Sequence, residues 1–131
     1  MSPEPSSPRR ILIVDDSSLV RLYYRDVLER GGFTIEQAIN GIEAMEKALD
    51  GAFDLIIVDV NMPRMDGFSF VRTLRRSTGE VATTPTLIIS TEAGATDFEY
   101  ARAAGVNFYL VKPVSEEQLL RHVSMLAGAS A

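Results

Sequence analysis

The chain has 131 residues, of which 46% are hydrophobic, and its formal net charge is −5. This length suits one domain with a substantial core, and the negative charge argues against nucleic-acid binding through phosphate neutralisation. The sequence has no cysteine, which excludes disulfides, thiolate zinc sites and thiol catalysis, and its single histidine cannot form a histidine metal cluster. No apolar run approaches the roughly 18 residues of a membrane-spanning helix. We therefore expect one cytoplasmic domain that contacts neither nucleic acid nor a membrane.

Strand-like and helix-like patterns alternate along the chain. Residues 1–8 are rich in serine and proline and predict a disordered tail, which precedes an ordered domain over 9–127 and a short tail over 128–131. In chain order we predict a strand at 11–14, a helix at 18–30, a strand at 33–39, a helix at 41–49, a strand at 54–59, a helix at 68–76, a strand at 86–90, a helix at 96–104, a strand at 107–111 and a helix at 115–126. Short connections between them imply right-handed crossovers. The expected fold is therefore α/β, a doubly wound parallel sheet of five strands with five helices.

Three acidic residues stand at the carboxyl ends of two apolar runs. Asp15 and Asp16 follow residues 11–14, and Asp59 follows residues 55–58. Because the carboxyl ends of parallel strands meet at one edge of a sheet, these carboxylates should lie close together. They repel one another unless a cation or a proton joins them, and Mg²⁺ prefers oxygen ligands. The pattern predicts a Mg²⁺ site, although a turn or helix-cap role would explain Asp15 and Asp16 alone nearly as well.

Other polar residues follow the remaining strand ends in a fixed order. The full set is Asp15-Asp16, Asp59, Asn61-Met62-Pro63, Asp66-Gly67, Ser90 and Lys112-Pro113. With these residues the chain resembles, from about residue 10 to residue 125, the receiver domain of bacterial two-component response regulators, of the single-domain chemotaxis-regulator type. The resemblance implies a flavodoxin-like sheet with the strand order 2-1-3-4-5.

The resemblance also implies a phosphoacceptor site. Asp59 would be the nucleophile that takes a phosphoryl group from a histidine. Asp16 would bind Mg²⁺ directly, Asp15 partly through water and Asn61 through its backbone oxygen, beside Asp59. Lys112 would place positive charge on a phosphoryl oxygen. Few of the 13 basic residues are lysines, which makes an ordinary surface role for Lys112 less attractive.

The resemblance also implies switch residues, which change conformation on phosphorylation, and timer residues, which control how fast the phosphoryl group is lost. Ser90 would move its hydroxyl towards the phosphoryl group, and Tyr109 would move into the space released. A helix cap at Ser90 and a half-buried strand aromatic at Tyr109 are the plainer interpretations. Asn61 and Glu92 would control dephosphorylation by governing the approach of water, unless both side chains merely face solvent. The resemblance further implies a cis peptide before Pro113.

The expected function is that of a stand-alone response regulator. It would not be a conventional enzyme but a phosphoacceptor that catalyses its own phosphorylation and dephosphorylation, in a chemotaxis pathway or a related one. Its partners would be a histidine kinase or histidine phosphotransfer protein and a target that binds the face of the fourth helix, fifth strand and fifth helix, and we expect a monomer. Arg21 and Arg25 could meet an acidic partner, or form an ordinary solvated helix face.

Three alternatives are weighed against this interpretation. Within the family, the chain could be a phosphate sink or a phosphorelay intermediate. A phosphatase of the haloacid dehalogenase type also uses a strand-end aspartate with Mg²⁺, but Asn61 stands where its general acid would be. A nucleotide or flavin binder lacks support, because no glycine-rich phosphate loop follows the first strand.

Overall fold

The elements follow one another as alternating strands and helices. In chain order they are β1 (Arg10–Val14), α1 (Ser18–Arg30), β2 (Thr34–Ala38), α2 (Gly41–Asp50), β3 (Leu55–Val58), α3 (Gly67–Arg76), the 3-10 helix η1 (Glu80–Thr83), β4 (Thr86–Ser90), α4 (Ala95–Ala104), β5 (Phe108–Val111) and α5 (Glu116–Ala127). These bounds come from a computed structural model that describes residues 8–128. The predicted tails 1–8 and 128–131 therefore lie outside the described residues, apart from Pro8 and Gly128.

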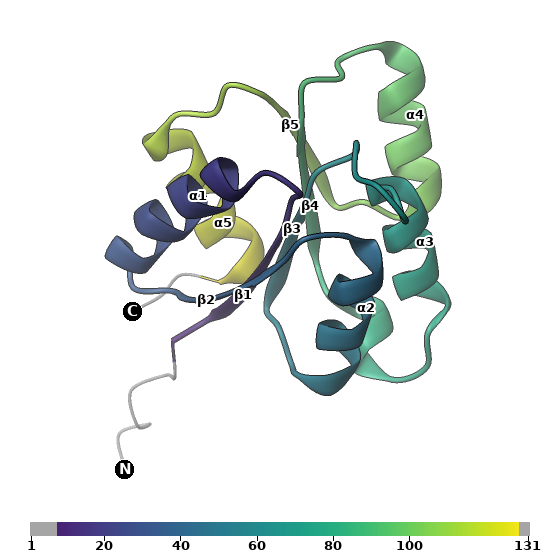
Figure 1. Cartoon of the computed structure of the whole chain (residues 1–131), viewed down its shortest axis with the longest axis horizontal. Helices are drawn as coiled ribbons and strands as arrows, with labels where there is room; N and C mark the ends of the chain where they lie inside the picture. The colour runs from purple at the N-terminus through teal and green to yellow at the C-terminus, as the bar shows by residue number, and fades with distance from the viewer. Residues whose placement is uncertain (1–7, 129–131) are drawn as a thin grey trace.

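The five strands form one parallel sheet in the order β2-β1-β3-β4-β5. In Figure 1 the sheet is seen nearly edge-on, with α1 and α5 on one side of it and α2, α3 and α4 on the other. The predicted fold class and strand order are confirmed. Central strands are covered on both faces, which is why β1, β3 and β4 appear in the sequence as continuous apolar runs.

Successive side chains of each strand serve two separate halves of the core. Leu12 and Val14 pack towards α2, α3 and α4, whereas Ile11 and Ile13 pack towards α1 and α5. This alternation follows from the two-residue period of a β-strand. Packing on both faces therefore holds the sheet in place, and its carboxyl edge supports the loops that follow the strands.

Side-chain caps begin several helices directly after the strand that precedes them. Ser17 accepts a hydrogen bond from the Val20 amide at 3.3 Å. Asn40 caps α2 through the Glu43 amide at 2.8 Å. Such caps satisfy amide groups that the first turn of a helix leaves without partners. They keep the loops at the carboxyl edge of the sheet short.

Each predicted bound of these strands and helices agrees with the observed one to within one residue, a difference that is common at element ends. One element was missed, since the segment between the third helix and the fourth strand contains η1. Among the described residues, no helix is long and apolar enough to cross a membrane.

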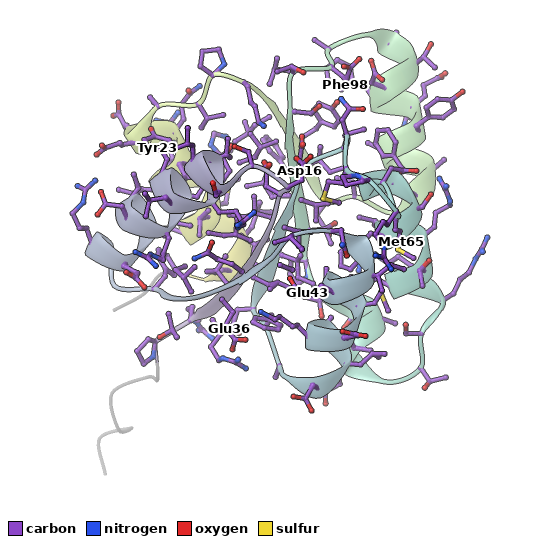
Figure 2. All side chains as sticks on the ribbon, viewed as in Figure 1. Asp16, Tyr23, Glu36, Glu43, Met65 and Phe98 are labelled. Carbon is purple, nitrogen blue, oxygen red and sulfur yellow. The ribbon has the colours of Figure 1, made fainter. Side chains whose placement is uncertain are left out.

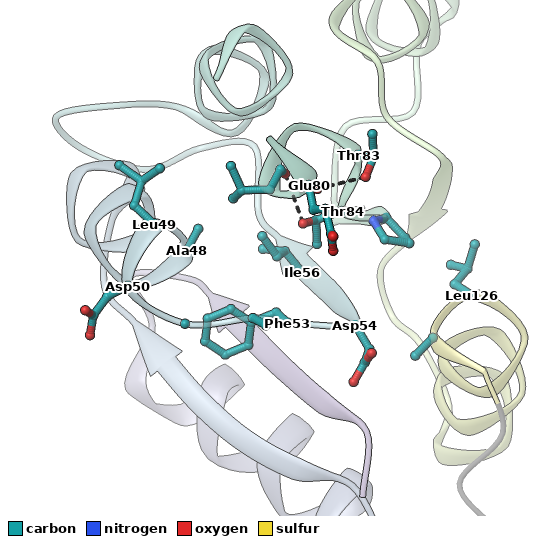
Figure 3. A pocket seen from close by; sticks show the side chains of 15 residues that line it. Ala48, Leu49, Asp50, Phe53, Asp54, Ile56, Glu80, Thr83, Thr84 and Leu126 are labelled. Carbon is teal, nitrogen blue, oxygen red and sulfur yellow. Dashed lines mark hydrogen bonds between the residues drawn. The ribbon is translucent and has the colours of Figure 1, made fainter. Parts of the chain in front are cut away.

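A cleft of about 450 Å³ lies at the amino edge of the sheet, between α2, η1 and the end of α5. Figure 3 shows that its lining combines the apolar Phe53 and Ile56 with the acidic Asp50 and Glu80. None of the predicted site residues lines this cleft. The predicted acidic residues lie instead at the opposite, carboxyl edge of the sheet.

Candidate functional site

The three predicted acidic residues meet at the carboxyl edge of the sheet. Asp15, Asp16 and Asp59 each offer a carboxylate oxygen, and these oxygens lie within 4.8 Å of one another. The Asp59 amide donates to the Val14 carbonyl at 3.0 Å, which fixes the end of β3 against β1. Asp15 is buried and Asp16 is exposed, and Figure 2 shows Asp16 between the two groups of helices. The sheet topology therefore brings together the carboxylates that the sequence placed at separate strand ends.

This donor set fits a hard divalent cation. Three carboxylates this close repel one another in the absence of positive charge, and Mg²⁺ binds through one or two carboxylates while keeping several waters. The exposure of Asp16 leaves one side open to such waters. Asp15, Asp16 and Asp59 would hold the ion, which would supply positive charge for the oxygens of a phosphoryl group.

Lys112 adds a fixed positive charge to the cluster. Its Nζ lies 3.5 Å from Asp15 Oδ2 and 3.7 Å from Asp59 Oδ1. Its backbone amide donates to the Ser90 carbonyl at 2.8 Å, and the Lys112–Pro113 peptide is cis, as predicted. Lys112 is therefore not an ordinary solvated lysine, because two carboxylates of the site are its neighbours.

Burial and charge set the protonation of Asp59. Burial, and after it the negative charge of Asp15, raise the pKa of Asp59 to about 6, although Lys112 and a hydrogen bond from the Val60 amide act against the shift. Asp59 is 9% exposed. Above pH 6 its carboxylate is ionised and can act as a nucleophile. The negative charge is unfavourable in this buried site, and a bound cation would stabilise it.

The loop that carries Asp15 is held by hydrogen bonds that could not be foreseen from the sequence. The carboxylate accepts from the Ser17 amide at 2.9 Å, and the Asp15 carbonyl accepts from Arg21 Nη1 at 2.6 Å. Arg21 Nε also donates to Gln37 at 2.9 Å. Arg21 therefore ties α1 to the loop after β1 and to β2, and its predicted contact with an acidic partner stays a prediction.

The loop after Asp59 requires glycine for a steric reason. A Cβ atom on Gly67 would lie 2.3 Å from the Asp59 carbonyl oxygen, and the Gly67 amide donates to the Val60 carbonyl at 2.9 Å. Asp66 caps α3 by accepting from the Ser69 amide at 2.9 Å. Arg64 adopts a φ of 77°, in the left-handed region. The Asp66-Gly67 pair therefore stands where the chain turns back and passes close to Asp59.

The predicted switch and timer residues form one hydrogen-bonded group. Ser90 is fully buried, and its Oγ accepts from the Glu92 amide at 3.1 Å. The Tyr109 hydroxyl donates to the Glu92 carbonyl at 2.7 Å, and Asn61 Nδ2 donates to Glu92 Oε2 at 3.3 Å. Four residues that the sequence placed on three separate segments therefore meet at Glu92. Their roles in signalling stay predictions.

Sequence reasoning missed one further polar group near the cluster. Tyr24 is 4% exposed and lies in the core between α1 and the sheet. Burial raises its pKa, and the nearby negative charges of Asp15 and Asp59 add to the shift. A tyrosine on the buried face of α1, where an aliphatic residue would suffice for packing, was the signal available in the sequence.

Comparison with known proteins identifies the arrangement. The family model of the response regulator receiver domain matches residues 11–124. A gliding motility regulatory protein of Myxococcus xanthus is 40% identical over 109 residues, which cover 82% of this chain. The transcriptional regulatory protein ResD of Bacillus subtilis is 34% identical and aligns with 97% of this chain. This chain spans only 14% and 52% of the lengths of those two relatives.

Among solved structures, the chemotaxis protein CheY4 of Vibrio cholerae is similar over its whole length. It superposes with a TM-score of 0.85 at 37% sequence identity, covering 91% of this chain and 98% of its own.

Proposed function

The chain belongs to the response-regulator receiver family, and we propose that it accepts a phosphoryl group on Asp59 in a Mg²⁺-dependent reaction and signals by binding another protein. Receiver domains are phosphoacceptor signalling domains that work with histidine kinases or histidine phosphotransfer proteins. The observation that carries the proposal is the position of Asp59, which shares a cluster of carboxylate oxygens within 4.8 Å and lies 3.7 Å from the Lys112 ammonium.

The chemistry follows from what these side chains offer. An Asp59 carboxylate oxygen attacks the phosphorus of a phosphohistidine, forming a P–O bond as the P–N bond breaks. The imidazole nitrogen leaves with the electron pair and takes up a proton. Lys112 places its ammonium against the negative charge of the phosphoryl oxygens, and the Ser90 hydroxyl would donate to another of these oxygens after leaving Glu92.

We assign output to the face formed by α4, β5 and α5. Phe98 is 41% exposed, Phe108 38% and Val111 39%, so apolar side chains lie open on this face. Apolar and aromatic groups at the centre of a surface are typical of protein interfaces. Figure 2 shows Phe98 above the cluster, on the side of α4. This face lies close to the phosphorylation site, so a structural change at Asp59 can reach it over a short distance.

We also propose a pathway setting linked to movement of the cell. The names of the Vibrio cholerae chemotaxis protein and the Myxococcus xanthus gliding motility regulator support it. A phosphate sink or a relay intermediate remains the second candidate. A sink would take up phosphoryl groups without a phosphorylation-dependent target, whereas a relay would pass them on to a histidine.

Transfer of labelled phosphoryl groups tests the proposal. Wild type should be labelled by a phosphorylated histidine kinase or by acetyl phosphate when Mg²⁺ is present, and Asp59→Asn should stay unlabelled. Lys112→Arg should accept the label yet fail to bind the target, because a guanidinium fork differs in shape from an ammonium. A pull-down that compares the free protein with its beryllofluoride form then separates a signalling role from a sink. Equal labelling of wild type and Asp59→Asn would refute the assignment.

A further inference from the structure

Glu92 is held at three points by three different segments. Its amide donates to Ser90 Oγ at the end of β4, at 3.1 Å, and its carbonyl accepts from the Tyr109 hydroxyl on β5, at 2.7 Å. Its side-chain Oε2 accepts from Asn61 Nδ2 in the loop after β3, at 3.3 Å. Glu92 therefore joins the aromatic residue of the output side to the side chain that stands two residues after Asp59.

The aromatic end of this connection is well fixed. The Tyr109 ring meets the Phe98 ring edge-on, with centroids 4.8 Å apart and an interplanar angle of 79°. The hydroxyl bond of 2.7 Å has the length of a good O–H···O hydrogen bond. Burial raises the pKa of Tyr109, so the phenol keeps the proton that it donates. Tyr109 thus holds the Glu92 carbonyl in one place.

The other end of the connection orients an amide. While Asn61 Nδ2 donates to Glu92, Asn61 Oδ1 remains an acceptor on the opposite side of the same rigid plane. A water that donates to this oxygen would be oriented near Asp59. The effect depends on Glu92, because an amide without this partner can rotate and present its NH₂ group instead.

We propose that Tyr109 is a positioning residue for hydrolysis of the Asp59 phosphate: its hydroxyl holds Glu92, and Glu92 holds the Asn61 amide that orients the attacking water. This inference rests on the proposed phosphorylation of Asp59. In the step itself, the water oxygen bonds to phosphorus as the P–O bond to Asp59 breaks. The carboxylate leaves with the electron pair, and both water hydrogens remain with the inorganic phosphate.

A double-mutant cycle on the decay of labelled protein tests the connection. Tyr109→Phe, which keeps the ring and removes only the hydroxyl, should slow hydrolysis about three-fold, the effect of loosening one hydrogen bond. Glu92→Ala should also slow it, and adding Tyr109→Phe to Glu92→Ala should change nothing further, because the side chain that carries the effect is gone. Tyr23→Phe is the matched control, since the Tyr23 hydroxyl donates to the Val114 carbonyl at 3.2 Å in another loop. It should decay like wild type.

Two other measurements distinguish a positioning role of Tyr109 from a general loss of function. Phosphorylation of Tyr109→Phe by acetyl phosphate, and its Mg²⁺ affinity, should equal those of wild type, since the change touches neither Asp59 nor the acidic cluster. Unchanged or faster decay in Tyr109→Phe would overturn the inference, and so would a slowing that persists in the Glu92→Ala background. Failure of wild type to be labelled at Asp59 would instead overturn the proposed function.

Discussion

Replacing Asp59 by asparagine should stabilise the metal-free protein at neutral pH. Burial and the neighbouring charge of Asp15 raise the pKa of Asp59 from 3.8 to about 6 in the folded state. Between these two values the folded chain holds a proton that the unfolded chain has released. The free energy of unfolding of wild type therefore falls as pH rises through this window, and the full cost of the charged group is present above pH 6.

The size of the effect follows from the same two pKa values. Their difference corresponds to about 3 kcal/mol above pH 6. The amide of asparagine must itself be buried, so we expect a net gain of about 2 kcal/mol. For a chain of this length that gain raises Tm by about 8 °C. Below about pH 4 both states of wild type are protonated and the gain should vanish.

Thermal and urea unfolding of wild type and Asp59→Asn between pH 4 and pH 8, with a chelator present, measures this difference. Saturating Mg²⁺ should narrow the difference, because the ion binds the folded wild type more tightly than the variant. Equal stability of the two proteins at pH 8, or a difference that does not change with pH, would refute the conclusion that Asp59 carries an unfavourable buried charge.

Three further predictions concern the metal, the timer and the fold. Asp16→Ala should weaken Mg²⁺ binding at least about 100-fold in a calorimetric titration, because the remaining ligands hold a reluctantly dehydrated ion poorly; unchanged affinity would remove Asp16 from the site. Asn61→Arg should slow loss of labelled phosphate about ten-fold by covering the path of water, and a decay equal to wild type would show that this position does not control access. Arg75→Met removes hydrogen bonds to the Gly105, Ala82 and Thr84 carbonyls and to two side chains, so it should lower the free energy of unfolding measured in urea by about 2–3 kcal/mol. Arg76→Met, at an exposed position, should change this free energy little, and similar losses in both variants would argue against a specific role for Arg75.

The acidic cluster could be predicted because it depends on topology alone. Asp15 and Asp59 follow apolar runs that had to be central strands, and the carboxyl ends of such strands converge in any parallel α/β sheet. No knowledge of side-chain orientation was needed. The same holds for Lys112, whose place after the fifth strand brings it to this edge.

Contacts made by long side chains could not be predicted in this way. The five hydrogen bonds of Arg75 join α3 to the segments around η1, α4 and β5, and nothing near Arg75 in the sequence marks these partners. Arg21 likewise appeared to be an exposed helix residue but binds the Asp15 carbonyl. The short helix η1 was missed because serine, threonine and glycine residues around it favour turns. Each miss concerns an interaction set by packing between elements distant in the sequence.

Locating the phosphoryl group tests the central claim most directly. Wild-type protein is incubated with acetyl phosphate and Mg²⁺, digested, and its peptides are mapped by mass spectrometry under conditions that preserve acyl phosphates. The account predicts one modified residue, Asp59, with the modification lost in Asp59→Asn and in the presence of a chelator. A phosphoryl group found on a different residue of the wild-type protein would contradict it.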